Sequence, residues 1–404
     1  MTGAPPRILQ VDADAFFVQV ARLEDPDGAG RADLLLVGGS PTGRGVVTSA
    51  SYAARRFGAH SGMPMARALR LCPDATVVGV PRRACAAKSR AIVQVLERFT
   101  PVVEPASIDE MYLDLSGTEG LYRGERLAAT ARRIRAAVLA ETAIAVSIGG
   151  GTNRLVAKLA AGRAKPHRTP DAGGVLVVPP GAEGAFLEEF VLEEIPGVGP
   201  RFQERLAHLG LHTVRDALRH DEATLCRWLG DRAGRWLARR IRGLDATPIE
   251  RRLHNKSISR DETFATDLAD DARLIHELLR LADRATADLR THGYAARTVA
   301  VRIRDHDFTT RQKRRTLPEP VISERVVALV AKELLDALRA ARRVPARLLG
   351  VSLASLVHEG AVDQLSLFQQ ETVPLETERD RRLARALDAV RGKYGADAVG
   401  RGLS

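Results

Sequence analysis

Short apolar strands alternate with long helices over much of the first 178 residues of this chain. From Val77 to Val178 the apolar pattern predicts a strand, a long helix, a hairpin, a second long helix, a strand, a helix and a strand. The helices are expected at residues 83–99, 125–141 and 153–163. Because such helices and strands bury their apolar sides only against one another, the pattern predicts an α/β structure with helices packed on one sheet.

The remainder of the chain is predicted to form a helical domain, a linker and a second α/β unit. Residues 186–244 have a helical pattern almost throughout, with short glycine turns and no strand pattern. Charged residues 245–259 are expected to form an extended linker. Two helices and two strands are then predicted at residues 272–292, 298–304, 323–341 and 348–353, with a last charged helix at 378–394.

The charge of the chain indicates a polyanionic partner. Its 404 residues include 61 Lys and Arg against 50 Asp and Glu, a net charge of +11. Proteins this basic usually bind nucleic acid, although an arginine-rich genome gives the same bias. Three distant cysteines, Cys72, Cys85 and Cys226, exclude a disulfide scaffold or zinc finger and suit a reducing cytoplasm. No uncharged apolar run reaches the ~18 residues of a membrane span, so no membrane association is expected.

Two acidic clusters follow apolar strands. One contains Asp12 and Asp14, and the other contains Asp109, Glu110 and Asp114. Carboxylates gathered from two strands at one sheet edge are the ligands that a pair of Mg²⁺ ions requires for phosphoryl transfer. Each acid by itself is equally suited to capping a helix or ending a strand. Because side chains alternate along a strand, Asp109 and Glu110 can serve one site only if the chain is irregular there, and a turn is expected just before them.

Eight short motifs stand in order along the chain. Five of them fall within the first 170 residues: Val11–Phe17, Ser51–Gly58 with Gly62–Pro64, Ser107–Asp114, Asn153–Lys158 and Ala164–Pro166. Three more follow: Ile195–Gly199, Lys256–Phe264 and Gln364–Phe368. Together these segments resemble the motifs of the Y-family (translesion) DNA polymerases, and most of all those of the polymerase IV branch.

The resemblance implies a multidomain α/β fold, a right-hand polymerase with a ferredoxin-like palm, small fingers, an all-α thumb and a separate α/β little finger. The expected boundaries are residues 1–15 and 78–178 for the palm, 16–77 for the fingers, 179–244 for the thumb, 245–259 for the linker, 260–357 for the little finger and 358–404 for a C-terminal tail.

The same resemblance implies a metal site. Asp12, Asp109 and Glu110 match the family's catalytic carboxylates, which hold two Mg²⁺ ions together with the backbone carbonyl of Ala13. Asp14 also belongs to the motif but is not a ligand in the family. We interpret it as the N-cap of the following helix, a position that Asp favours.

A nucleotide site is implied next to the metals. Tyr52 and Arg55 lie three apart on a short predicted helix and share a face, and with Lys165 they match the family's grip on the triphosphate of the incoming dNTP. The planar fork of arginine binds phosphate oxygens bidentately. After Lys165 the family usually continues Pro-Asn-Gly, whereas this chain continues Pro-His-Arg and has a longer turn.

Phe16, Phe17 and Thr48 are also assigned to the nucleotide site. Phe17 matches the steric gate that clashes with a ribose 2′-hydroxyl, and the alternative is a core phenylalanine beside Phe16. Thr48 and the small residues after it are expected to face the nascent base pair, which implies an open site and low fidelity. Gly149–Gly151 lacks the Gly-Lys-Ser/Thr of a nucleotide P-loop and is interpreted as a tight strand-to-helix turn.

Further motifs imply contacts with DNA and with a partner protein. Gly197 and Gly199 resemble the hairpin of a helix-hairpin-helix element that binds DNA phosphate, with a simple packing corner as the alternative. A basic sheet face is expected to lie along the DNA backbone and is formed by Arg302, Arg304, Arg311, Lys313 and Arg314. The polar tail contains a peptide that resembles a motif for the bacterial sliding clamp, with Gln364, Leu365, Leu367 and Phe368 as its contact residues.

The expected function is template-directed, low-fidelity DNA synthesis across damaged template, by a monomer acting on primer-template DNA and dNTPs. Two alternatives share the first domain. One is a catalytically silent relative that binds DNA and the clamp, against which the three carboxylates argue. The other is a nucleotide cyclase, which needs neither the thumb hairpin, the basic face nor the clamp peptide.

Overall fold

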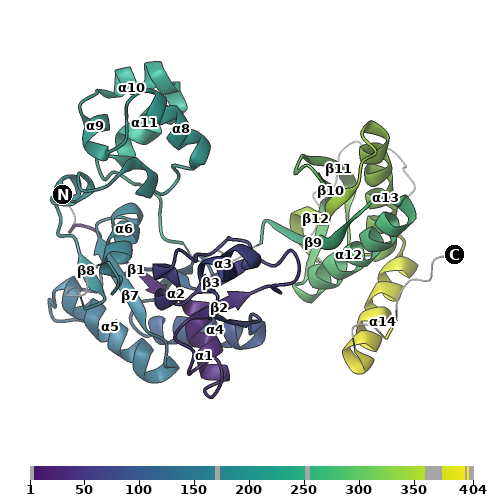
Figure 1. Cartoon of the computed structure of the whole chain (residues 1–404), viewed down its shortest axis with the longest axis horizontal. Coiled ribbons are helices and arrows are strands. Elements are labelled where there is room, and N and C mark those ends of the chain that lie inside the picture. Colours follow the sequence, from purple (N-terminus) through teal and green to yellow (C-terminus); the bar gives the residue numbers. More distant parts are fainter. Residues whose placement is uncertain (1–3, 169–172, 251–254, 360–374, 396–397, 400–404) are drawn as a thin grey trace. The chain divides into compact units, whose positions relative to one another are not determined.

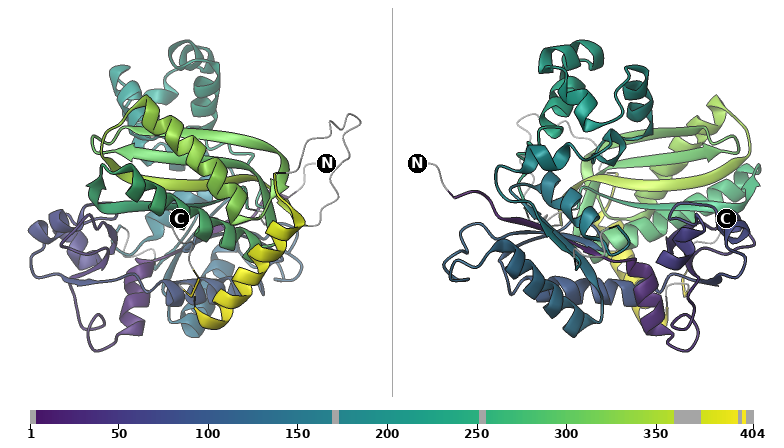
Figure 2. Two further views of the ribbon diagram at one scale, coloured as in Figure 1. Left: turned by 90° about the vertical axis from the view of Figure 1, so that its right-hand side faces the viewer. Right: turned by 60° about the vertical axis from the view of Figure 1, so that its left-hand side comes forward.

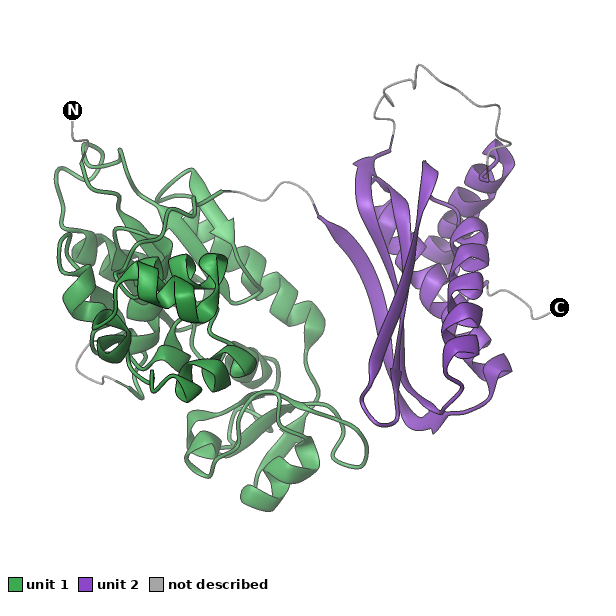
Figure 3. Ribbon diagram, turned by 90° about the horizontal axis from the view of Figure 1, so that it is seen from above, with its two compact units in different colours: residues 1–252 green, residues 253–404 purple. Residues whose placement is uncertain are grey.

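The computed structural model divides the chain into two compact units, residues 1–252 and 253–404 (Figure 3). It describes residues 4–168, 173–250, 255–359, 375–395 and 398–399. The division falls within the linker expected from the sequence. Each unit has its own sheet and core, as two separate α/β units require.

The central sheet of the first unit has five strands in the order β5-β6-β1-β7-β8. Its strands are β1 (Ile8–Ala13), β5 (Val102–Pro105), β6 (Glu110–Asp114), β7 (Val146–Gly151) and β8 (Val175–Val177). Strand β1 runs antiparallel to both β6 and β7, and β7 runs parallel to β8. This arrangement puts β1, which carries the first acidic cluster, in the middle of the sheet.

Helices cover both faces of this sheet (Figure 1). Leu9 and Val11 point from β1 into the core formed with α4 (Arg82–Leu96) and α5 (Leu127–Thr142). Alternation along the strand turns Asp12 to the other face. That face is covered by α6 (Arg154–Ala164), which packs on β7 and β1.

Glycine allows α6 to lie close to the sheet. Gly149 belongs to β7, and a Cβ atom there would lie 2.0 Å from the backbone nitrogen of Ala161 and 2.1 Å from the carbonyl oxygen of Ala157. The expected tight turn at Gly149–Gly151 is therefore wrong. These glycines lie within a strand, where the helix backbone approaches too closely for a side chain.

A smaller sheet, in the order β3-β2-β4, lies beside the first one in the same unit. Its strands are β2 (Leu35–Gly38), β3 (Val47–Ala50) and β4 (Thr76–Val78), and its helices are α1 (Phe16–Glu24), α2 (Tyr52–Arg56) and α3 (Met65–Leu71). The hydroxyl of Ser51 accepts the N–H of Ala54 and caps α2. The cap fixes where α2 starts and so places Tyr52 in its first turn.

The last part of the first unit is helical, as expected. It consists of α7 (Glu183–Leu187), a 3₁₀ turn (Leu192–Glu194), α8 (Pro200–His208), α9 (Val214–Leu218), α10 (Glu222–Leu229) and α11 (Asp231–Arg240). Its core continues into α6 through Leu155, Val156 and Leu159. The predicted hairpin around Gly197 is thus flanked by a single 3₁₀ turn on one side and by α8 on the other.

The second unit is a four-stranded antiparallel sheet, in the order β11-β10-β12-β9, with two helices packed on one face (Figures 1 and 2). Its elements are β9 (Ser257–Leu268), α12 (Asp271–Thr291), β10 (Tyr294–Asp305), β11 (Thr310–Val321), α13 (Glu324–Ala341) and β12 (Ala346–His358). Strand β9 was not predicted, because only two of its twelve residues, Phe264 and Leu268, are buried and the apolar pattern is weak. It pairs with β12 as an edge strand and begins at Ser257, before the expected end of the linker.

A final helix, α14 (Glu378–Tyr394), forms over the residues predicted. It begins with a capping box between Thr377 and Asp380. Within the described residues, no helix has the length and apolar character needed to cross a membrane.

Candidate active site

Asp12 and Glu110, one from each acidic cluster, meet where β1 ends and β6 begins, whereas Asp114 lies at the far end of β6. Asp12 on β1 is the register partner of Glu110 on β6. Residues directly opposite each other on antiparallel strands share a face, with their Cβ atoms roughly 5 Å apart. Both carboxylates therefore project toward the side of the sheet that α6 covers.

The chain is irregular just before β6, as the site requires. The hydroxyl oxygen of Ser107 accepts the N–H groups of Asp109, at 3.2 Å, and Glu110, at 3.0 Å. The carbonyl of Asp109 accepts the N–H of Ala13 at 2.9 Å. Asp109 thus lies in a turn next to the end of β1 rather than in the pleat of β6, so its backbone lies beside the strand end that carries Asp12.

Two lysines of the α6 region neutralise this cluster. Lys165, at the C-cap of α6, places its Nζ 2.8 Å from Asp12 Oδ1, and Lys158 places its Nζ 2.6 Å from Glu110 Oε2. Burial raises the pKa of Asp12 to about 6, against the opposing effect of Lys165. The negative charges of Glu110 and Asp109 raise it further. The site is therefore one where an ionised carboxylate gains from a nearby cation.

The donor set suits a hard divalent cation. The side-chain oxygens of three acids and the carbonyl of Ala13 are the ligands that Mg²⁺ prefers. Across the described ranges, no three Asp, Glu, His or Cys side chains are arranged so that they could already hold a metal ion. Asp12 and Glu110 are instead turned toward the lysine ammonium groups and Asp109 toward the Ser107 hydroxyl, so each acid already has a donor partner.

Asp14 has a different role from the one expected. The N-cap position of α1 is occupied by Ala15, in the left-handed conformation with φ of 44°, and no side chain caps this helix. Asp14 is buried instead, and its Oδ1 accepts the hydroxyls of Ser147, at 2.8 Å, and Tyr52, at 3.3 Å. Asp14 thus accepts a hydrogen bond from Tyr52 instead of capping α1.

A cavity of about 360 Å³ opens beside the carboxylates. Its lining includes Asp12, Glu110, Lys158, Arg55, Lys165 and His167. Arg55 donates its Nε proton to the carbonyl of Ala50 at 3.0 Å, and its guanidinium lies over the Tyr52 ring, 4.9 Å from the centroid. The structure therefore brings together Tyr52, Arg55 and Lys165 as the sequence predicted. Lys158 and His167 also line the cavity, although neither was predicted as a site residue. Lys158 is the last residue of the Asn153–Lys158 motif.

The two phenylalanines after Asp14 differ in exposure. Phe16 is only 1% exposed and packs into the core of the central sheet, so its side chain is withdrawn from the cavity and its assignment to the nucleotide site stays a prediction. Phe17 is partly buried against both cores of this region, with its ring edge-on to Phe16 at 5.5 Å. Thr48, on β3, is also partly accessible. Only Phe17 of the two phenylalanines remains a candidate gate.

The basic face of the second unit contains fewer residues than expected. Residues paired across β10 and β11 share a face, which places Arg314 opposite Ala300, on the side of Arg302 and Arg304. Arg311 and Lys313 are opposite Ile303 and Val301 and so belong to the helix side. Their predicted place on the basic face is wrong, since a strand alternates its side chains between faces. Arg311 also pairs with the buried Asp305, at 2.9 Å.

The remaining predicted residues lie in the helical region and in the tail. Gly197 has φ of +103°, and a Cβ atom there would lie 2.6 Å from the Trp236 ring, so glycine is required at this turn. Gly199 is the N-cap of α8. Gln364, Leu365, Leu367 and Phe368 lie outside the described residues.

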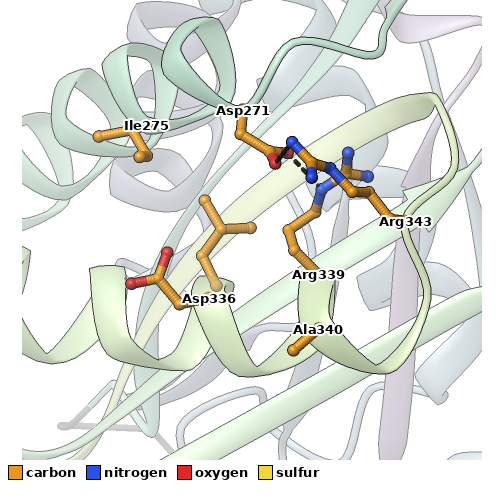
Figure 4. A pocket seen from close by; sticks show the side chains of 7 residues that line it. Asp271, Ile275, Asp336, Arg339, Ala340 and Arg343 are labelled. Atoms are coloured by element: carbon orange, nitrogen blue, oxygen red, sulfur yellow. Dashed lines mark hydrogen bonds and ion pairs between the residues drawn. The ribbon is translucent and has the colours of Figure 1, made fainter.

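Another hollow lies in the second unit, where Asp271 faces Arg339 and Arg343 (Figure 4). It lies between α12 and α13 and is lined by Ile275, Leu335 and charged groups. Asp271 pairs there with Arg339, at 2.6 Å, and with Arg343, at 2.7 Å. These contacts are structural, and the candidate site is the cavity beside Asp12.

Sequence comparison identifies the family. A family model described as the impB/mucB/samB family matches residues 11–162, and the model of that family's C-terminal domain matches residues 255–367. The DNA polymerase IV of Dehalococcoides mccartyi (strain CBDB1) is 35% identical over 97% of this chain and 96% of that polymerase. The chain belongs to the impB/mucB/samB family. The DNA polymerase IV of Alkalilimnicola ehrlichii is a further relative in this family, 39% identical over 87% of this chain and 95% of that protein.

Solved structures agree with this family. A Y-family DNA polymerase chimera, Dbh-Dpo4(243-245)-Dbh, superimposes with a TM-score of 0.76 at 26% identity, over 87% of this chain and 99% of that one. The insertion ternary complex of Dbh DNA polymerase gives a TM-score of 0.60 over the same shares. The expected resemblance to Y-family polymerases is thus confirmed, and as a member of this family the chain is a DNA-directed DNA polymerase of the translesion type.

Proposed function

We propose that the chain extends a DNA primer by two-metal nucleotidyl transfer at Asp12, Asp109 and Glu110. The observation that carries the proposal is the meeting of these three acids at one sheet edge, beside a cavity that also contains Arg55 and Lys165. The acids and the Ala13 carbonyl would hold two Mg²⁺ ions. When bound, the ions would activate the primer 3′-hydroxyl and neutralise charge on the phosphates.

The protein groups around the cavity bind and orient the nucleotide. Lys165 and Arg55 offer positive charge to the triphosphate, and the terminal N–H groups of Arg55 have no protein partner among the described residues. The Tyr52 hydroxyl donates a hydrogen bond to Asp14, and this contact keeps the Tyr52 ring beneath the Arg55 guanidinium. Phe17 limits the space at the sugar, and deoxynucleotides are preferred for that reason. Such positioning supplies much of the rate in phosphoryl transfer, because little covalent chemistry is left to the protein.

We assign the parts of a right-hand polymerase on the same basis. The five-stranded sheet with α4, α5 and α6 is the palm, and the three-stranded sheet with its helices is the fingers. The helical region from α7 to α11 is the thumb, where Gly197 and Gly199 would let backbone N–H groups approach DNA phosphate. The second unit is the little finger, which would follow the DNA backbone with Arg302, Arg304 and Arg314.

The tail supplies a further contact in this proposal. Gln364, Leu365, Leu367 and Phe368 would bind the bacterial sliding clamp as an apolar peptide in a polar segment. The enzyme would act as a monomer in the cytoplasm, where the free thiols of Cys72, Cys85 and Cys226 stay reduced.

Primer extension tests the proposal. Wild type, with Mg²⁺, dNTPs and a primed template, is expected to add template-directed nucleotides, and Asp109→Ala/Glu110→Ala to add none. Asp114→Asn is the matched control, since Asp114 lies in the same motif but at the far end of β6, where its carboxylate accepts the N–H of Ser116 at 2.8 Å. A wild type that binds the primed template and adds nothing would support the silent relative instead.

A further inference from the structure

His167 lies in the nucleotide cavity and has no role in the mechanism above. It follows Lys165 by two residues, where this chain has Pro-His-Arg in place of the family's usual Pro-Asn-Gly. It lines the same cavity as Asp12, Arg55 and Lys165. Neither of its ring nitrogens has a hydrogen-bond partner within the described part of the chain.

The surroundings of His167 are cationic and aromatic. Its ring lies 4.7 Å from the ring of Tyr52, with an interplanar angle of 34°. Partial burial and the charges of Arg55, Arg168 and Lys165 lower the pKa of His167. A neutral imidazole still carries one N–H donor. Cations repel one another, so such a cluster gains from a bound anion.

The short turn that carries His167 is held in place. The N–H of Arg168 donates to the carbonyl of Lys165 at 2.9 Å. The Arg168 guanidinium pairs with Glu194 at 2.7 Å, and Glu194 also pairs with Arg163 of α6. The imidazole is thus positioned at the cavity before any ligand arrives, which reduces the entropy lost on binding.

We infer that His167 is a further contact to the triphosphate of the incoming nucleotide and that its ring keeps Tyr52 in position. This inference rests on the proposed function, because the triphosphate site is the one formed by Tyr52, Arg55 and Lys165. The imidazole N–H donates to a non-bridging phosphate oxygen, a charge-assisted hydrogen bond that orients the triphosphate. His167 contributes to nucleotide binding and leaves the binding of primer-template DNA unchanged.

Single-nucleotide incorporation tests the contact. His167→Ala is expected to raise the KM for dCTP opposite a template guanine about tenfold, the effect of one hydrogen bond to a charged group. The kcat is expected to stay within about twofold of wild type, because the contact is made before and during the reaction alike. His167→Asn keeps an N–H donor and should recover most of the affinity. The Kd for primed template should be the same in all three proteins.

His358→Ala is the matched control. His358 lies 4.8 Å from the ring of Tyr294, also at an interplanar angle of 34°, but in the second unit. Its substitution removes a similar ring contact and should leave the KM for dCTP unchanged. Thermal unfolding of each variant checks that it folds.

Binding of inorganic tripolyphosphate, measured by calorimetry, tests the same contact without catalysis. His167→Ala should bind it about tenfold more weakly than wild type. If wild type fails to extend a primer, the proposed function fails while this measurement still decides the role of His167. The inference would be overturned if His167→Ala had the same KM for dCTP and the same affinity for tripolyphosphate as the wild type. It would also be overturned if His167→Asn lost as much nucleotide affinity as His167→Ala, or if the substitutions weakened only the binding of primed template.

Discussion

In the proposed function, the choice of sugar depends on one side chain, Phe17. Its ring is partly buried and lies edge-on to the buried Phe16. Phe17→Ala is expected to raise ribonucleotide incorporation about 10- to 100-fold relative to deoxynucleotides, since it removes a steric clash in the pocket. Competing dCTP and CTP in single-nucleotide incorporation measures this ratio. Phe16→Leu should lower stability without changing the ratio, and an unchanged ratio in Phe17→Ala would make Phe17 a core residue.

The buried carboxyl of Asp14 links function to stability. Burial raises the pKa of Asp14 above its ordinary value. A folded pKa above the unfolded one gives stability that is present below the unfolded pKa, about 4, and lost as pH rises through the folded pKa. Asp14→Asn is therefore expected to melt at a higher temperature than wild type at pH 7, with the difference shrinking toward pH 4. Thermal unfolding from pH 4 to 8 checks this, and equal melting temperatures at pH 7 would contradict it.

At the scale of elements, the position of α6 depends on Gly149. Helix α6 carries Lys158 and ends at Lys165, and it packs on Gly149 too closely for a Cβ atom. Gly149→Ala is expected to destabilise the protein by about 3 kcal/mol or more, because helix or strand backbone must move. Gly184→Ala, in α7 with open space around it, is the control and should be tolerated. Equal stability of both variants would show that α6 is free to shift.

Ion pairs rather than apolar contacts hold α14 on the second unit. Arg290 pairs with Asp388 at 2.6 Å and Arg325 with Asp380 at 2.6 Å, while Ala384 is the helix's only buried apolar residue. Arg290 is 5% exposed, and without Asp388 its buried charge is left with Glu324, at 3.4 Å, as its ion-pair partner. Because a hydrogen-bonded charge pair to α14 is lost, Asp388→Ala is expected to speed amide exchange in α14 about tenfold or more.

Hydrogen-deuterium exchange of residues 378–394 measures this release, and added salt should promote it in the wild type. Glu378→Gln is the control, since among the described residues the ion-pair partner of Glu378 is the exposed Arg382 of the same helix. Slow exchange in Asp388→Ala would mean that apolar packing holds the helix.

At the scale of the whole molecule, net charge and its distribution govern DNA binding. Arg302 and Arg314 are exposed on one face of the second unit, whereas Arg315 lies on the other and pairs with Glu333. Arg302→Ala and Arg314→Ala are each expected to weaken the binding of primed template. Each should also lower the slope of log Kd against log salt concentration by about one, the contribution of a single phosphate contact. Arg315→Ala should change neither. Titrations of primed template at several salt concentrations measure both, and equal slopes would remove this face from the DNA contact.

Local pattern was sufficient to predict most of the fold. Apolar periodicity predicted the helices and the buried strands. The side chains on the buried face recur with the period of the helical turn or of the strand pleat, and this repeat can be seen in the sequence. It failed for β9, an edge strand in which only Phe264 and Leu268 are buried. It also assigned Arg311 and Lys313 to the wrong face of the sheet. Which residues of β11 share a face with Arg302 and Arg304 depends on the register in which β10 and β11 pair, and only the structure gives that register.

The sequence by itself determined which residues could form the site, since the acids, Tyr52, Arg55 and Lys165 were identified from motifs. Only the tertiary structure decided their partners. Asp14 accepts the Tyr52 hydroxyl, and His167 lines the cavity beside Asp12, because segments distant in sequence pack together there. Motifs are local in sequence, whereas hydrogen bonds and charge interactions depend on distances that only the packed chain defines.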